Sequence, residues 1–231
     1  MNFLLNIDDK NDLVGIIFLS RLFKEPNKER CKYFDKYLID NYGDAMKELI
    51  SQIYNINCPL SLRVKFWLRA YTLETKFYKD MNSDLMKDKL KPYIPYIQLL
   101  YSGLMMNNFH FSYFLNLFRG ALIKKEEINN LINLFEKSKV SADPCVLIYS
   151  KAFMSFSLDY DVAMNYMNSK EPTEKEERVL YILESDELRC VKNATNAYLR
   201  DISFFEDEEE VLVFPFSFYE ISNIQKKIII I

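Results

Sequence analysis

Residues 205–221 read FEDEEEVLVFPFSFYEI, an acidic run that leads directly into apolar sequence. The segment 211–221 is rich in Val and Phe, which predicts strand structure after the acidic run. Taken alone, the acidic residues at 206–210 indicate a solvated turn. Glu208 and Glu210 are two positions apart, however, and on a strand that spacing places both side chains on one face. The stretch therefore predicts two carboxylates that reach the same cleft.

Two earlier segments place polar residues on apolar, strand-like sequence. The first is LFRGA at 117–121, in which Arg119 follows an apolar run and Gly120 stands beside it. The second is FMSFS at 153–157, which contains Ser155 and Ser157 and leads into a helical stretch at 159–167. Separately, such an arginine is most often a salt-bridge residue, and a Ser-x-Ser pair most often marks a strand edge. Their order along the chain makes them a candidate constellation.

The rest of the sequence divides into a helical front half and a mixed second half. Up to about residue 106, apolar residues recur with helical spacing, as in 13–22, 46–53, 64–71 and 97–104. After about residue 109, β-rich runs at 114–123, 145–157, 179–183 and 211–221 alternate with helical stretches at 126–135 and 159–167. This order predicts the α+β class. The last residues, 228–231, are interpreted as a final edge strand.

Composition excludes several classes of protein. The 231 residues suffice for one medium domain, and the formal net charge of -3 provides no basic excess to neutralise phosphates, which argues against a nucleic-acid partner. The four cysteines are dispersed and His110 is the single histidine, so we expect no metal site. The cysteines are interpreted as free thiols in a reducing compartment.

Other motifs are missing. With four glycines, the sequence contains neither GxGxxG nor a P-loop, and His110 has no recognisable triad partner. The first ten residues carry Asp8 and Asp9 and do not resemble a signal peptide, and the longest apolar stretches are too short to cross a bilayer. We therefore expect a cytoplasmic protein with no membrane partner.

Together and in this order, the three segments resemble the arginine-serine-glutamate class of mono-ADP-ribosyltransferases. That class has an Arg on its first core strand, a Ser-x-Ser strand before a helix, and Glu-x-Glu before Val-Leu. The residues that match the last and most specific part of the pattern are Phe205, Glu208, Glu210, Val211, Leu212, Pro215, Phe216 and Tyr219. The segment 71–82, YTLETKFYKDMN, resembles the helix that precedes the arginine strand in the intracellular branch of the family. The likeness covers about residues 65–224.

The resemblance implies a division of the chain and a place for the cofactor. Residues 61–231 would form the ADP-ribosyltransferase domain, with a helical part at 61–108 and a catalytic core at 109–231. The core would contain two small, roughly perpendicular β-sheets with NAD in the cleft between them. Residues 1–60 would be a helical region without an assigned role.

The resemblance also implies the roles of individual residues at the reacting bond. The reaction leaves positive charge on the ribose of NAD, and a carboxylate stabilises such a cation. Glu210 would accept a hydrogen bond from the ribose 2′-hydroxyl, and Ser155 would hold Glu210 in register. Arg119 would bind the NAD phosphates, because its planar guanidinium forms paired hydrogen bonds with them.

Further residues are assigned to NAD and to the acceptor. Gly120 would let the backbone approach NAD, and Phe156 and Ser157 would line the NAD site beside Ser155. Phe156 stands where the family often has Thr. Phe205 and Glu208 would meet the target protein, and Glu at this position accompanies arginine acceptors in the family.

The resulting hypothesis is a transferase that moves ADP-ribose from NAD to an accessible arginine of a target protein, without a metal. Two alternatives remain open, an NAD glycohydrolase on the same fold and an inactive module that binds NAD or protein. The enzyme would act in its own cytoplasm or be delivered into a host cell as an effector. The sequence leaves the target and the oligomeric state undetermined.

Overall fold

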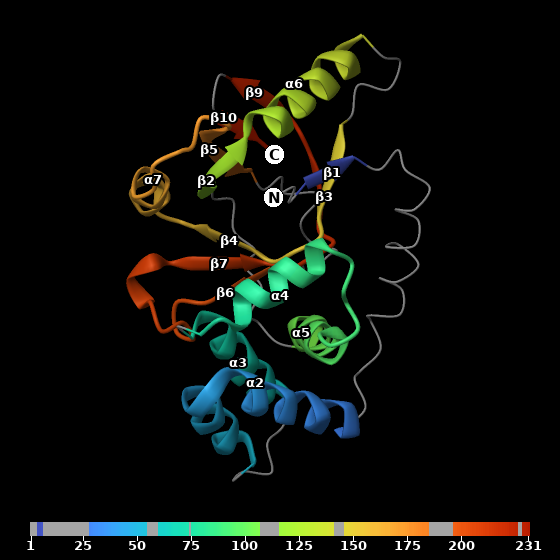
Figure 1. The fold of residues 1–231 in the computed structure, drawn as a ribbon, viewed down its shortest axis with the longest axis vertical. Helices are drawn as coiled ribbons and strands as arrows, with labels where there is room; N and C mark the ends of the chain where they lie inside the picture. The colour runs from blue at the N-terminus through green and yellow to red at the C-terminus, as the bar shows by residue number, and fades with distance from the viewer. Residues whose placement is uncertain are drawn as a thin grey trace.

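The computed structural model describes residues 4–6, 28–54, 60–73, 75–106, 116–140, 146–184, 196–225 and 228–231 (Figure 1). The helices in these ranges are α2 (Lys28–Tyr54), α3 (Leu60–Thr72), α4 (Phe77–Met86), α5 (Ile94–Met106), α6 (Lys125–Lys139) and α7 (Tyr160–Asn168). The strands are β1 (Leu4–Asn6), β2 (Leu117–Lys124), β3 (Leu147–Ser150), β4 (Met154–Ser157), β5 (Glu176–Leu183), β6 (Asn196–Tyr198), β7 (Glu210–Val213), β8 (Phe218–Glu220), β9 (Asn223–Gln225) and β10 (Ile228–Ile230). A 3-10 turn occupies Glu206–Glu208.

The front half of the described chain is helical, as predicted. α2 is interrupted at Gly43, whose φ of 82° and ψ of -169° lie outside the helical region. Glycine adopts a positive φ at little cost because it lacks a Cβ atom. The helix predicted around 46–53 is therefore the second limb of α2. The helical segment expected at 13–22 lies outside the described residues.

A buried carboxylate fixes α2 to α3. Asp35 of α2 is fully buried, and a buried charge is destabilising unless its oxygens are hydrogen-bonded. Arg63 Nη1 donates to Asp35 Oδ2 at 2.6 Å, and Trp67 Nε1 donates to Asp35 Oδ1 at 3.0 Å. α2 thus packs in one core with α3, although it lies within the region 1–60.

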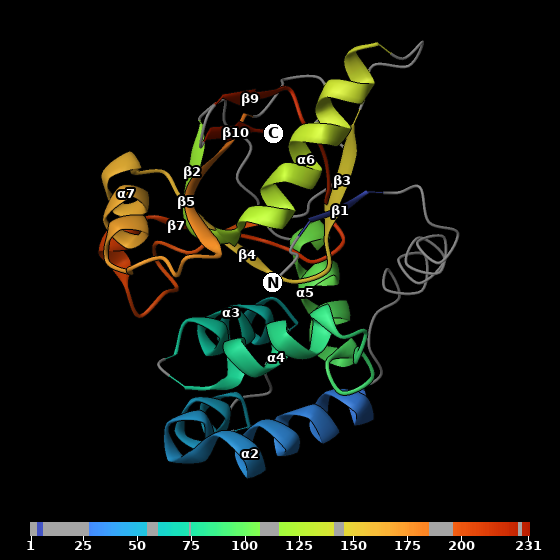
Figure 2. The same ribbon diagram turned by 45° about the horizontal axis from the view of Figure 1, so that its top comes forward.

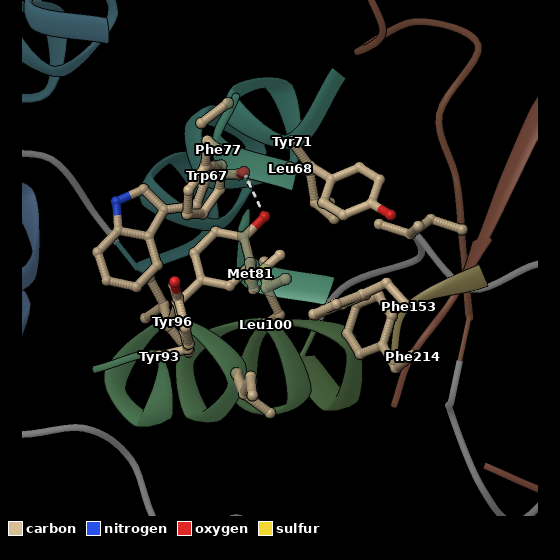
Figure 3. Packing of buried hydrophobic residues seen from close by; sticks show 14 of the residues in the cluster. Trp67, Leu68, Tyr71, Phe77, Met81, Tyr93, Tyr96, Leu100, Phe153 and Phe214 are labelled. Atoms are coloured by element: carbon tan, nitrogen blue, oxygen red, sulfur yellow. Dashed lines mark hydrogen bonds between the residues drawn. The ribbon is translucent and has the colours of Figure 1, made fainter. Parts of the chain in front are cut away.

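That core is aromatic and continues into the sheet (Figure 3). The ring of Trp67 stacks on Tyr96 of α5, with 5.5 Å between the centroids. Tyr96 also contacts Phe153 edge-on at 6.0 Å, and Phe153 immediately precedes β4. The helices therefore pack directly against the start of a strand that carries three of the predicted site residues, Ser155, Phe156 and Ser157.

Two sheets, built from the second half together with β1, confirm the α+β class. The larger sheet has seven strands in the order β6-β7-β4-β2-β5-β10-β9, and the smaller has three in the order β1-β3-β8. Within the larger sheet β10 and β5 are parallel, and the other pairs are antiparallel. Figures 1 and 2 show α2 to α5 gathered at one end of the molecule and the strands at the other.

Two strands depart from expectation. β1 lies within the region 1–60 that was expected to be helical, and it pairs with β3, with Leu4 opposite Ser150. β10 is a strand, as predicted, but the prediction that it is an edge strand is wrong. β10 lies between β5 and β9, and Ile229 is 1% exposed. A strand of consecutive isoleucines buries more apolar surface between two neighbours than at an edge.

Candidate active site

Three predicted residues meet on three neighbouring strands. Arg119 lies on β2, Ser155 on β4 and Glu210 on β7, and these strands are adjacent in the sheet. Arg119 Nη1 donates to the Ser155 carbonyl oxygen at 2.7 Å. The Ser155 hydroxyl donates to Glu210 Oε1 at 2.5 Å. A cation, a hydroxyl and a carboxylate from distant parts of the sequence are thus held together.

Glu210 is a buried carboxylate, with 8% of its surface exposed. Burial raises its pKa, and the nearby negative charge of Glu208 adds to the rise. The hydrogen bond from Ser155 and the positive charge of Arg119 oppose these effects, but the net direction is upward. An ionised carboxylate with so little solvation interacts strongly with a positive charge that develops beside it.

The two serines of β4 hold different partners. Ser155 holds the carboxylate of Glu210, whereas the Ser157 hydroxyl donates to the Glu208 carbonyl oxygen at 2.7 Å. Ser157 is 6% exposed, and its oxygen accepts from the Asp159 amide at 2.9 Å. Its hydroxyl therefore positions the acidic turn. We had expected Ser157 to line the NAD site, but its hydroxyl is bonded within the protein.

Glu208 reaches the site by a different route from the one predicted. We expected Glu208 and Glu210 to share one face of a strand, but β7 begins only at Glu210. Glu208 ends a 3-10 turn, and Glu209 has a left-handed backbone with φ 43° and ψ 47°. Glu208 is exposed, and partial burial raises the pKa of its carboxyl. Its negative charge still contributes to the raised pKa of Glu210.

The turn before Glu208 presents aromatic rings to solvent. Phe205 is 38% exposed and Phe204 43% exposed, so neither ring belongs to the core. Phe204 is held by α3, because the Arg69 guanidinium lies 4.4 Å from its ring centroid and its amide donates to the Thr72 hydroxyl at 3.2 Å. Phe205 thus projects from an anchored segment.

Two residues expected to contact NAD pack inside the protein instead. A Cβ atom on Gly120 would lie 2.2 Å from the Ala163 carbonyl oxygen and 2.6 Å from Met167 Cβ. The glycine therefore allows α7 to approach β2 closely. Phe156 is 3% exposed and belongs to the apolar core of the second half, because strand alternation turns it away from Ser155.

Tyr71 of α3 was not among the predicted site residues. Tyr71 is buried, its hydroxyl oxygen accepts a hydrogen bond from Asn82 Nδ2 at 3.1 Å, and its pKa is raised by burial and then by the charge of Glu210. Its spacing matches the apolar face of a helix, which is typical of a core residue. The only available signal was its place in the segment 71–82.

Other expectations concern features away from this cluster. Cys31 is a buried free thiol, whereas Cys58, Cys145, Cys190 and His110 lie outside the described residues. In the described part of the chain, no group of three or more His, Cys, Asp or Glu side chains could hold a metal ion. None of the helices described is long and apolar enough to cross a membrane.

Comparison with known proteins identifies the fold. No protein-family model matches the chain, and no curated protein matches its sequence. Solved structures do match. The ADP-ribosyltransferase HopU1 of Pseudomonas syringae pv. Tomato DC3000 superposes with a TM-score of 0.58 at 13% identity, over 90% of this chain and 97% of HopU1.

Two further matches were solved with small molecules bound. The ADP-ribosyltransferase Vis, a Vibrio splendidus toxin, in complex with agmatine has a TM-score of 0.51 and 16% identity, over 90% of this chain and 86% of Vis. Exoenzyme S of Pseudomonas aeruginosa, with 14-3-3 protein beta and carba-NAD, has a TM-score of 0.51 and 12% identity, over 86% of each chain. The chain therefore has the fold of the ADP-ribosyltransferases.

Proposed function

We propose that this protein is a mono-ADP-ribosyltransferase that moves ADP-ribose from NAD to an arginine side chain of a target protein. One observation carries the proposal: the buried Glu210 carboxylate accepts a hydrogen bond from Ser155, beside Arg119. The fold that this chain shares with the ADP-ribosyltransferase HopU1 supports the assignment of this reaction to these residues.

The proposed reaction begins at the bond between C1′ of the ribose and the nicotinamide nitrogen. That bond breaks, nicotinamide leaves with the electron pair, and positive charge develops on the ribose. Glu210 accepts a hydrogen bond from the 2′-hydroxyl and stabilises the charge electrostatically. Ser155 keeps the carboxylate in place through the bond at 2.5 Å. Because Glu210 is buried, little water screens this interaction.

Arginine is the acceptor that best fits Glu208. A guanidinium has a pKa above about 12 and is a poor nucleophile until a base takes its proton. Glu208 is exposed, stands two positions before Glu210, and its charge contributes to the raised pKa of Glu210. In the proposed step a guanidinium nitrogen forms a bond to C1′, and its proton passes to Glu208. The Vis complex supports this choice, because agmatine carries a guanidinium group.

NAD is the proposed ADP-ribose donor, and the carba-NAD complex of exoenzyme S supports it. Arg119 is assigned to the NAD phosphates, since a guanidinium forms charge-assisted hydrogen bonds with phosphate oxygens. Ser157, Gly120 and Phe156 are not assigned direct contacts with NAD, because their side chains or Cβ positions face the protein. We place the activity in the cytoplasm, either of the producing cell or of a host.

Incubation of the protein with labelled NAD and either agmatine or a cell lysate tests the proposal. We expect labelled ADP-ribose on agmatine and on arginine in lysate proteins, with equimolar release of nicotinamide. Free ADP-ribose without a labelled acceptor would indicate a glycohydrolase. NAD binding without turnover would indicate an inactive binding module. Label found only on side chains other than arginine would contradict the assignment of Glu208.

A further inference from the structure

The acidic turn at residues 205–209 is attached to the rest of the protein at both of its ends. At the end that leads into β7, the Ser157 hydroxyl donates to the Glu208 carbonyl oxygen at 2.7 Å. At the other end, the Phe204 amide donates to the Thr72 hydroxyl oxygen at 3.2 Å. The first attachment comes from β4 and the second from α3, so the helical half and the sheet both hold the turn (Figure 1).

Thr72 forms its attachment through a single hydroxyl group. The hydroxyl proton is donated to the Arg69 carbonyl oxygen at 3.0 Å, and the hydroxyl oxygen accepts from the Phe204 amide. The Arg69 carbonyl is among the last four of α3, which have no partner within the helix. Thr72 is 7% exposed, so the helix end and the start of the turn are joined in a site that is shielded from water.

Arg69 holds the side chain of the same phenylalanine. Its guanidinium carbon lies 4.4 Å from the centroid of the Phe204 ring, which is within the range of a cation–π interaction. The Arg69 Nε atom is buried, and it has no hydrogen-bond partner in the described part of the chain. A partly desolvated cation interacts more strongly with an aromatic ring than an exposed one does. α3 therefore fixes both the backbone and the ring of Phe204.

This attachment matters because of the residue that follows it. The Phe205 amide donates to the Ser203 hydroxyl oxygen at 3.0 Å, and its carbonyl oxygen accepts from the Glu208 amide at 3.2 Å. The backbone of Phe205 is thus bonded on both sides, whereas its ring is 38% exposed. Aromatic rings are enriched where proteins meet. A fixed and exposed ring near the proposed acceptor base is suited to pack against the polypeptide that carries the acceptor arginine.

We propose that Arg69 and Thr72 are positioning residues that determine how well the enzyme binds a polypeptide acceptor. They act by holding Phe204, and through it Phe205, without touching the acceptor themselves. This proposal rests on the proposed function, because it takes Glu208 as the base for the acceptor arginine. The attachment from β4 supports the chemistry at Glu208, and the attachment from α3 supports recognition of the chain around the arginine. The preferred substrate is an arginine with an apolar neighbour that packs on the Phe205 ring.

A comparison of two acceptors separates the two attachments. Agmatine offers a guanidinium group, whereas a synthetic peptide with one arginine between two leucines also offers apolar side chains. Arg69→Met removes the charge and keeps a long side chain. We expect it to raise KM for the peptide about 5- to 30-fold, as for the loss of a partly desolvated cation–π interaction. KM for agmatine should change far less.

Two variants and a control show whether the ring contact and the hydroxyl are responsible. Arg69→Lys keeps the cation and should recover most of the peptide binding. Thr72→Val removes the hydroxyl with almost no change in shape and should raise KM for the peptide about 2- to 10-fold, whereas Thr72→Ser should resemble the wild type. Lys65→Met is the matched control, because it removes a positive charge from α3 one turn before Arg69. Both KM values should stay near those of the wild type.

A double variant tests whether Arg69 acts through Phe205. Phe205→Ala alone should raise KM for the peptide, because it removes the exposed ring. Adding Arg69→Met to it should have little further effect, since residues that act through one contact are not additive. Additive effects in the double variant, or equal effects of Arg69→Met on the peptide and on agmatine, would overturn the positioning role.

Amide hydrogen exchange, followed by NMR, needs no turnover and so separates this proposal from the proposed function. Exchange of the Phe204 and Phe205 amides should be about 5- to 30-fold faster in Arg69→Met than in the wild type, and unchanged in Lys65→Met. Unchanged exchange at both amides in Arg69→Met would show that α3 does not hold the turn. If the wild type modifies neither acceptor, the proposed function is refuted, and hydrogen exchange alone decides whether Arg69 positions the turn.

Discussion

Replacing Glu210 by Gln keeps the shape of the side chain and removes its charge, so it isolates electrostatic stabilisation. At about 4 Å and an effective dielectric constant of about 20, a charge pair contributes about 4 kcal/mol. This corresponds to a loss of roughly 1000-fold in kcat. Because the charge acts mainly in the transition state, NAD affinity should change little. Transfer and hydrolysis should fall together, as measured by nicotinamide release and by label on agmatine.

The same variant should be more stable than the wild type at neutral pH. Burial raises the pKa of Glu210 in the folded protein above its value in the unfolded chain. Ionisation of Glu210 therefore destabilises the folded protein. The wild type loses this stability as the pH rises from the pKa of Glu210 in the unfolded chain through its raised pKa in the folded protein. Glu210→Gln cannot ionise and does not lose this stability. In urea unfolding, its free energy of unfolding should exceed that of the wild type most clearly above the raised pKa, and the difference should vanish in acid. A near-normal rate, or lower stability than wild type at pH 7, would refute the assignment.

Three further substitutions test separate features of the site. Glu208→Gln should suppress transfer to agmatine while NAD hydrolysis persists, and equal loss of both activities would contradict the role of Glu208 at the acceptor. Arg119→Ala should raise KM for NAD more than it lowers kcat, as expected for a ground-state phosphate contact. If steady-state kinetics show a larger effect on kcat than on KM, the assignment of Arg119 is wrong. Gly120→Ala should destabilise the fold by about 1–3 kcal/mol or more, because the added methyl group meets the α7 backbone at 2.2 Å. Unchanged urea unfolding would show that α7 can move away.

Local sequence patterns predicted most of the elements because they reflect local physics. α6 shows this well, since Ile128, Leu131 and Phe135 are buried at helical spacing. Its first turn carries Glu126 and Glu127, which favours a helix start through the helix dipole. The neighbours of β10 were not predictable in the same way. β10 pairs with β9, which directly precedes it, but its other neighbour is the distant strand β5, which local sequence does not indicate.

Some residues of the site were predicted correctly and others were not, whereas most elements of the fold were predicted. Arg119, Ser155 and Glu210 were found because their three segments, taken together and in order, resemble a known family, whereas each segment taken alone was ambiguous. Phe156 was assigned to NAD, although strand alternation already indicated that it faces away from Ser155. The acidic run also indicated a turn, but the family resemblance favoured a strand at Glu208, and the left-handed backbone of Glu209 that ends the turn is not evident from the run of acidic residues.

β4 is the element on which these contacts converge. Its Ser155 carbonyl holds Arg119, and its two hydroxyls hold the Glu210 carboxylate and the Glu208 backbone. The amide just before it is held by Asn82 of the helical half. Residues that act through one strand share their effects, so substitutions among them should not be additive. The helical half is therefore part of the proposed catalytic unit, because it fixes the strand from which the charged groups are positioned.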